Sequence, residues 1–271
     1  MGFLDSIRRE AAEYAKQAAR QWLDNQSVES DSHDASSGKQ KNTVERTPRR
    51  SGTETPDLAI VAVADWVDAG RPRQKPIDWP QVEWIGAFPE HEEMLASMDN
   101  PLSRADVRET ARSQPDDETG AVAAFVATMA WGYGRTGYGR SRTRKVLDSN
   151  SDAPQKLARA REVAANGGLR AAFDAYTYLA GQGRLEHLGP AFGTKFIHFH
   201  NSEGLILDKL TAEWYERACG IDLKPTHWNP DRYREYLAFM GGWAESVGVQ
   251  PEELEEIAFG QVSRERGNQW A

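Results

Sequence analysis

The sequence has little cysteine and no long apolar run. Its 271 residues include a single cysteine, Cys219, which rules out a disulfide within the chain and a four-cysteine zinc or iron–sulfur site. No apolar run approaches the roughly 18–20 residues that a transmembrane helix needs, and the N-terminus lacks the apolar core of a signal peptide. We therefore expect a cytoplasmic protein that does not enter a membrane.

Runs of β-branched residues are also rare, and the chain is short of positive charge. Leucine, alanine and tryptophan are plentiful, which favours an all-α fold. The net charge of −8 argues against a protein that coats nucleic acid with its whole surface. Residues 131–161 nevertheless carry six arginines and two lysines against two aspartates. This local excess is enough for a phosphate-binding face, although a solvated helix face would have the same composition.

The pattern along the chain divides it into three parts. In residues 3–23, apolar side chains recur every three or four positions, which predicts an amphipathic helix. This helix could dock on the body, self-associate or bind a protein partner; membrane binding is disfavoured because its polar face is mixed in sign. Residues 24–56 are polar and predict a flexible linker. Residues 57–271 predict a helical domain.

Within that domain, periodicity and breakers indicate a series of helices. Residues 118–131 are apolar enough to form a central buried helix, and residues 70–89 form a connection rich in proline and tryptophan. The other expected helices cover residues 58–69, 90–98, 103–113, 152–166, 169–180, 191–200, 208–219, 231–247 and 251–261.

A loop rich in glycine and aromatic residues follows the apolar helix, from Trp131 to Arg140. Glycines let a backbone approach a ligand, aromatic rings can stack on it, and arginines can hold phosphates. Its GxGxxG-like spacing does not indicate a dinucleotide site, because the loop follows a helix and not a strand. A packed loop with aromatic anchors is the plainer alternative. The candidate phosphate contacts are Arg135, Arg140, Arg142, Arg144 and Lys145.

The stretch from Leu188 to Asp208 carries the candidate chemistry. A Gly-Pro break precedes a predicted helix, and Lys195 lies near the start of that helix, where the helix dipole disfavours a charged amine. Asp208 immediately precedes the next helix, as an N-cap does. Taken singly, the two residues could be a surface lysine and an ordinary cap. His198 and His200 are two residues apart and therefore lie on different helix faces, so we expect no metal site and no cofactor.

Three segments resemble a known family: Trp131–Gly139 (WGYGRTGYG), Leu188–Phe196 (LGPAFGTKF) and Leu205–Asp208 (LILD). They are similar to bacterial 8-oxoguanine DNA glycosylase fold (OGG-like) proteins of the helix-hairpin-helix DNA glycosylase superfamily, which carry a glycine hairpin, a lysine and a downstream aspartate. The hairpin departs from the usual Leu-Pro-Gly-Val-Gly-x-Lys form, because its proline follows the first glycine and one extra residue precedes the second.

The resemblance implies a helical glycosylase that binds double-stranded DNA, with its hairpin and catalytic segment in residues 184–208. Lys195 would attack C1′ of the sugar and form a Schiff base, and Asp208 would stabilise the positive charge on the sugar. The substrate would be an 8-oxoguanine-like base, or a hypermodified phage base in antiviral defence. A non-catalytic DNA-binding protein with the same fold is the alternative. The hairpin residues expected at a phosphate are Gly189, Gly193 and Thr194, and those expected around the base are Trp131, Tyr133, Tyr138, Phe192 and Phe196.

Overall fold

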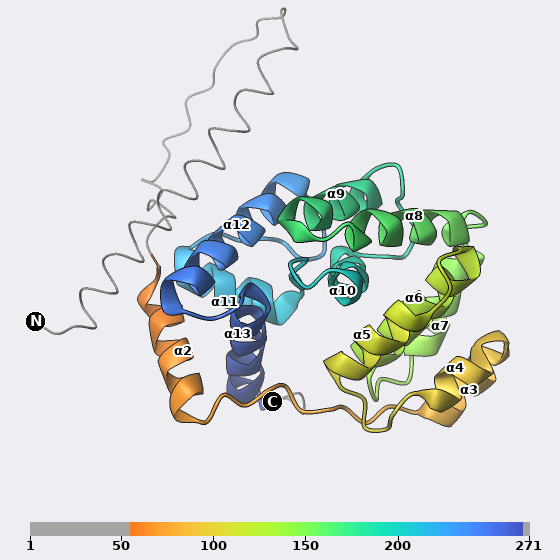
Figure 1. Ribbon diagram of the computed structural model, residues 1–271, viewed down its shortest axis with the longest axis horizontal. Coiled ribbons are helices and arrows are strands. Elements are labelled where there is room, and N and C mark those ends of the chain that lie inside the picture. Colours follow the sequence, from red (N-terminus) through yellow and green to blue (C-terminus); the bar gives the residue numbers. More distant parts are fainter. Residues whose placement is uncertain (1–54, 268–271) are drawn as a thin grey trace, which may run out of the picture.

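The computed structural model describes residues 55–267, which form an all-α body with twelve α-helices, one short 3-10 helix and no strand (Figure 1). The predicted fold class is thus confirmed. The expected helix 3–23 and nearly all of the linker 24–56 lie outside the described residues. Between residues 55 and 267, no helix is both long enough and apolar enough to cross a bilayer.

Two helices were not expected from the sequence, α3 (Gln81–Ala87) and α7 (Gly139–Asp148). Helix α3 has only seven residues and lies among prolines, and α7 buries only Gly139, Thr143 and Val146. Neither helix shows a clear periodic pattern of apolar residues in the sequence. The helices are α2 (Asp57–Asp68), α3 (Gln81–Ala87), η1 (Pro89–His91), α4 (Glu92–Ser97), α5 (Arg104–Ser113), α6 (Glu118–Tyr133), α7 (Gly139–Asp148), α8 (Ala153–Ala165), α9 (Gly168–Ala180), α10 (Pro190–His200), α11 (Lys209–Cys219), α12 (Pro230–Val247) and α13 (Pro251–Glu265).

The helices form two groups that flank α10. Helix α2 packs on α11, α12 and α13, so the two ends of the described chain lie in the same group (Figure 1). Helices α3 to α8 form the other group. Helix α10 packs on α5, α6, α8 and α9, and α9 in turn contacts α12. This arrangement places α10 where both groups can contribute side chains to one site.

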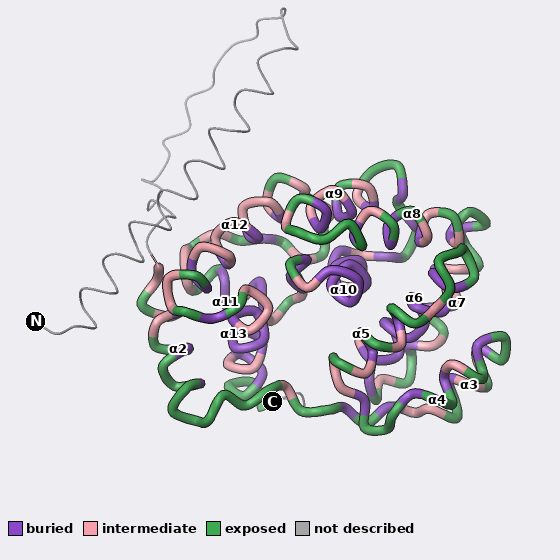
Figure 2. Tube along the Cα trace, viewed as in Figure 1, coloured by how far each residue is buried: buried purple, intermediate pink, exposed green. Residues whose placement is uncertain are grey.

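Helices α6 and α10 are buried along most of their length (Figure 2). All residues of α10 from Gly193 to His200 are buried, as are twelve residues of α6. A helix that is covered on all sides must be apolar all round, which the sequence of α6 shows clearly. In α10, however, the buried residues include a lysine and two histidines. Burial of charged or titratable groups is costly without partners, and such groups cluster at functional sites, so these three residues mark α10 as a candidate functional helix.

Candidate active site

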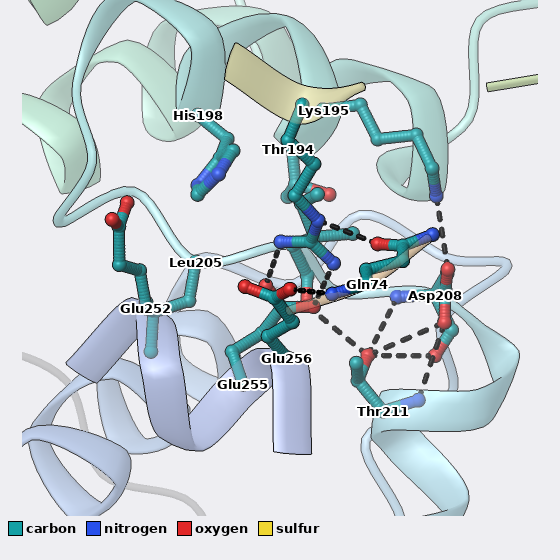
Figure 3. A network of polar contacts seen from close by, with 12 residues as sticks. Gln74, Thr194, Lys195, His198, Leu205, Asp208, Thr211, Glu252, Glu255 and Glu256 are labelled. Carbon is teal, nitrogen blue, oxygen red and sulfur yellow. Dashed lines mark hydrogen bonds and ion pairs between the residues drawn. The ribbon is translucent and has the colours of Figure 1, made fainter. Parts of the chain in front are cut away.

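Lys195 and Asp208 meet between the two groups of helices. Lys195 lies in the second turn of α10, and its Nζ is 3.0 Å from Oδ2 of Asp208 (Figure 3). Their side chains are only 9% and 15% exposed. The two residues are 13 positions apart in the sequence, and the rest of α10, a turn and a short extended link lie between them. The structure therefore pairs the two residues that the sequence singled out.

Asp208 divides its two carboxylate oxygens between two tasks. As the N-cap of α11, it accepts hydrogen bonds at Oδ1 from the backbone N–H groups of Leu210 (3.0 Å) and Thr211 (3.2 Å). Its own N–H donates to Oγ1 of Thr211 and completes a capping box. The cap fixes the side-chain rotamer, and Oδ2 is left facing Lys195.

The extended link before Asp208 is held by hydrogen bonds to two helices, α10 and α12. The backbone N–H of Leu207 donates to Oγ1 of Thr194 on α10. The hydroxyls of Tyr233 and Tyr236 on α12 donate to the carbonyl oxygens of residues 205 and 206. All of these partners are buried. The position of the carboxylate thus depends on α10 and α12 and not on the local sequence alone.

The local electrostatics keep Asp208 ionised. Burial by itself would raise the pKa of this carboxyl, but the Lys195 ammonium and the N–H groups at the start of α11 outweigh it and hold the pKa below its usual value. A carboxylate in this position can stabilise positive charge that develops nearby.

The Lys195–Asp208 pair lies at the wall of a pocket of about 420 Å³. On one side, the rings of Tyr133 and Phe192 stack with their centroids 4.2 Å apart, and Lys195 Nζ lies 5.5 Å from the centroid of Phe192. Four of the five aromatic residues predicted around the base line this pocket; Phe196 does not, because it is fully buried against Phe125. The lining residues are Gln74, Arg104, Trp131, Gly132, Tyr133, Thr136, Tyr138, Ala191, Phe192, Lys195, Ile206, Asp208, Lys209, Leu210, Phe259 and Arg266.

The predicted hairpin residues lie elsewhere. Helix α10 begins at Pro190, so the turn between α9 and α10 consists of residues 181–189, with Gly189 as the N-cap of α10. Gly193 N–H is bonded to the carbonyl of Gly189, and a Cβ at Gly193 would lie 2.3 Å from the ring of Trp228. Thr194 is buried and holds the extended link. Both Gly193 and Thr194 therefore have packing roles, and neither belongs to the DNA surface proposed below.

The predicted phosphate contacts differ in how they are engaged. Arg135 pairs with Asp78. Arg144 donates to the carbonyl of Ala87, pairs with Glu90 at 2.7 Å and covers the ring of Phe88, so it fastens α7 to the α3–η1 segment. The remaining three residues of the set form no ion pair within residues 55–267: Arg140, Arg142 and Lys145. Arg142 and Lys145 are also exposed.

Two pocket residues that the sequence analysis missed are Gln74 and Arg104. Arg104 forms a buried ion pair with Glu255 of α13 at 2.6 Å, and its guanidinium lies 5.4 Å from the centroid of the Trp131 ring. Gln74 belongs to the connection between α2 and α3. Both residues reach the pocket only through long-range packing, so no local motif marks them.

Gly132 leaves room for the two side chains beside it. A Cβ at this position would lie 2.6 Å from Cε1 of Phe192 and 3.2 Å from Cδ of Lys195. We expect Gly132→Ala to shift both side chains and to slow any reaction at Nζ by about 10- to 100-fold. Gly137→Ala is the matched control, because a Cβ there meets nothing within 4 Å. Single-turnover rates measure the effect, and equal rates for both variants would contradict it.

The two histidines of α10 are buried within the body. His198 Nε2 lies 3.0 Å from Nη2 of Arg108, which can only donate, so Nε2 accepts and Nδ1 donates to the carbonyl of Gly204. Burial lowers the pKa of His198 well below its usual value and that of His200 to about 3. Within residues 55–267, no group of three His, Cys, Asp or Glu side chains could hold a metal ion.

Comparison with known proteins places the sequence in a family. Residues 70–259 match the model of the family described as "Putative 8-oxoguanine DNA glycosylase OGG-like protein". No curated protein and no solved structure gives a match. The matched region includes every helix from α3 to α12, both residues of the Lys195–Asp208 pair and most of α13. By its sequence, the chain belongs to this OGG-like family.

Proposed function

We propose that this protein is a DNA glycosylase that removes a damaged or modified base and then cleaves the strand at the resulting abasic site. The observation that carries the proposal is the Lys195–Asp208 pair, with Nζ and Oδ2 3.0 Å apart at the wall of an aromatic pocket. A buried amine beside a fixed carboxylate suits attack on an electron-poor carbon. Family membership supplies the substrate class, DNA.

The proposed reaction begins with a base that has left the DNA stack, at a cost of a few kcal/mol that pocket contacts offset. The Phe192 and Tyr133 rings provide apolar surface for those contacts. As the bond between C1′ and the base breaks, positive charge develops on the sugar, and the Asp208 carboxylate lies beside the pocket to stabilise it.

Lys195 then forms the covalent intermediate. The Lys195 ammonium gives a proton to the departing base, which takes the electron pair of the glycosidic bond, and the neutral Nζ then donates its own electron pair to C1′. Ring opening gives a Schiff base between Nζ and C1′. Loss of a proton from C2′ then expels the 3′ phosphate, which breaks the strand. Each of these steps uses only groups of the protein and of the DNA.

Borohydride trapping tests the proposal. Duplexes that carry 8-oxoguanine, glucosylated hydroxymethylcytosine or an abasic site are incubated with the protein and reductant, and covalent adducts are separated on denaturing gels. We expect an adduct with the abasic duplex and with one of the two base-containing duplexes. Which of the two base-containing duplexes forms the adduct distinguishes removal of a damaged base from removal of a modified phage base. Absence of an adduct on all three would rule out the covalent mechanism.

A non-catalytic DNA-binding protein is the second candidate, and the exposed Arg142 and Lys145 on α7 favour binding in either case. The affinity for DNA falls as salt rises. We expect the alanine variant of each residue to make this dependence weaker, by about 0.9 in the slope of log K against log salt for every phosphate that the variant no longer neutralises. Arg144→Ala is the control: its partners are within the protein, so it should lower stability and leave the slope unchanged. Binding titrations at several salt concentrations measure the slopes. Equal slopes for all variants would exclude α7 from the DNA surface.

A further inference from the structure

The Gln74 side chain carries an unused hydrogen-bond donor beside the pocket. Gln74 lines the pocket together with Lys195 and Asp208, and its side chain extends toward that pair (Figure 3). Its Nε2 is buried and has no hydrogen-bond partner. A buried donor without an acceptor is unfavourable, and such groups in native proteins call for an explanation.

The orientation of this amide follows from its neighbour. Arg104 Nε donates to Oε1 of Gln74 at 2.7 Å. Because a guanidinium can only donate, the amide oxygen must face Arg104, and the NH₂ group must then face away from it. A flipped amide would place two donors against each other.

Arg104 is itself held firmly. Its Nη1 pairs at 2.6 Å with Glu255, which is fully buried, and its guanidinium lies over the ring of Trp131. The backbone N–H of Gln74 donates to Oε1 of Glu256. The connection between α2 and α3 is thus tied to α13 and α5 around this one side chain, and the direction of the Nε2 donor is set before any ligand enters.

We propose that Gln74 determines base specificity by donating a hydrogen bond from Nε2 to a carbonyl oxygen of the flipped base. This inference rests on the proposed glycosylase function and deepens it, because it defines the substrate class as bases with an oxo group on the edge that faces Gln74. A base with an amino group there would leave two donors opposed and unpaired. Sites that read a substrate through buried polar groups reject such analogues strongly.

Two variants isolate the donor. Gln74→Met keeps the length of the side chain but removes both amide atoms. Gln74→Glu keeps an acceptor for Arg104 and removes the donor, but it adds a negative charge, whose effect on Lys195 is registered by trapping on the abasic duplex. Gln114→Met is the matched control, since this half-buried glutamine donates to the carbonyl of Thr110 outside the pocket. Each variant is assayed for base release on the base-containing duplex that the wild type processes, and for trapping on the abasic duplex, where no base is present.

The ratio of base release to abasic trapping decides the inference. We expect this ratio to fall by about 10- to 100-fold in both Gln74 variants and to stay unchanged in Gln114→Met. An unchanged ratio overturns the inference. A fall in Gln74→Met alone also overturns it, because the defect would then come from Arg104. Failure of the proposed function is seen separately, as absence of base release and trapping in the wild type, and this inference would fall with it.

Discussion

Lys195→Gln is expected to abolish borohydride trapping on every duplex and to lower base release by about 10³-fold or more. The variant has no primary amine, so no Schiff base can form, while its amide can still donate to Oδ2 of Asp208. That hydrogen bond preserves the partner of a carboxylate that is only 15% exposed. Gel separation of reduced adducts and single-turnover kinetics measure the two effects.

Lys209 offers a stringent control for this prediction. It is the second lysine at the same pocket, next to Asp208 in sequence, but it is exposed and begins α11. Lys209→Ala should therefore trap like the wild type. If Lys209→Ala abolished the adduct and Lys195→Gln kept it, the nucleophile would be Lys209 and the roles proposed for α10 would be wrong.

Asp208→Asn is expected to lower base release by about 10²- to 10³-fold while the protein remains folded. Asparagine caps helices about as well as aspartate, so the bonds from the N–H groups of Leu210 and Thr211 persist. The substitution removes the negative charge beside Lys195, and removal of one such preorganised group typically costs this much in rate. Asp208→Ala should reduce activity to the same extent and cost about 1 kcal/mol more in stability, because it also removes the cap.

The difference in stability between the wild type and Asp208→Asn should depend on pH in a definite direction. The folded protein holds the pKa of Asp208 below its usual value, so the carboxylate contributes stability above the unfolded-state pKa of about 3.9. That contribution is lost as pH falls through the folded-state pKa. The difference in unfolding free energy between wild type and Asp208→Asn should thus be largest near neutral pH and shrink below about pH 4. Urea unfolding across this range measures it, and a difference that grows on acidification would contradict the ion pair.

Gln74 and Arg104 show how the two groups of helices make one pocket. Arg104 begins α5, and its partner Glu255 lies 151 residues away on α13. Burial raises the pKa of Glu255, although Arg104 opposes this effect. Such a pair adds little net stability but is costly to break. Its consequence here is geometric, because it fixes the Arg104 side chain and, through it, the Gln74 amide.

Much of the local structure could be predicted from the sequence. The capping position of Asp208, the start of α10 at a Gly-Pro break and the apolar run of α6 all follow from interactions within a few residues. The expected helix boundaries lie within a few positions of the observed ones. The exceptions, α3 and α7, are held mainly by neighbours: Arg144 of α7 bonds to the carbonyl at the end of α3.

The sequence by itself determined the helical class and the order of most helices, because caps, breakers and apolar period act over one or two turns of chain. It singled out Lys195 and Asp208 through the resemblance of their segments to the family motif. Only the tertiary structure decided which side chains meet. In the folded protein, Gly193 and Thr194 are buried under neighbouring elements, Arg144 bonds to α3, and Gln74 lines the pocket. These outcomes depend on contacts between residues tens of positions apart, whose energies come from burial and charge pairing in the folded body, and no local pattern encodes them.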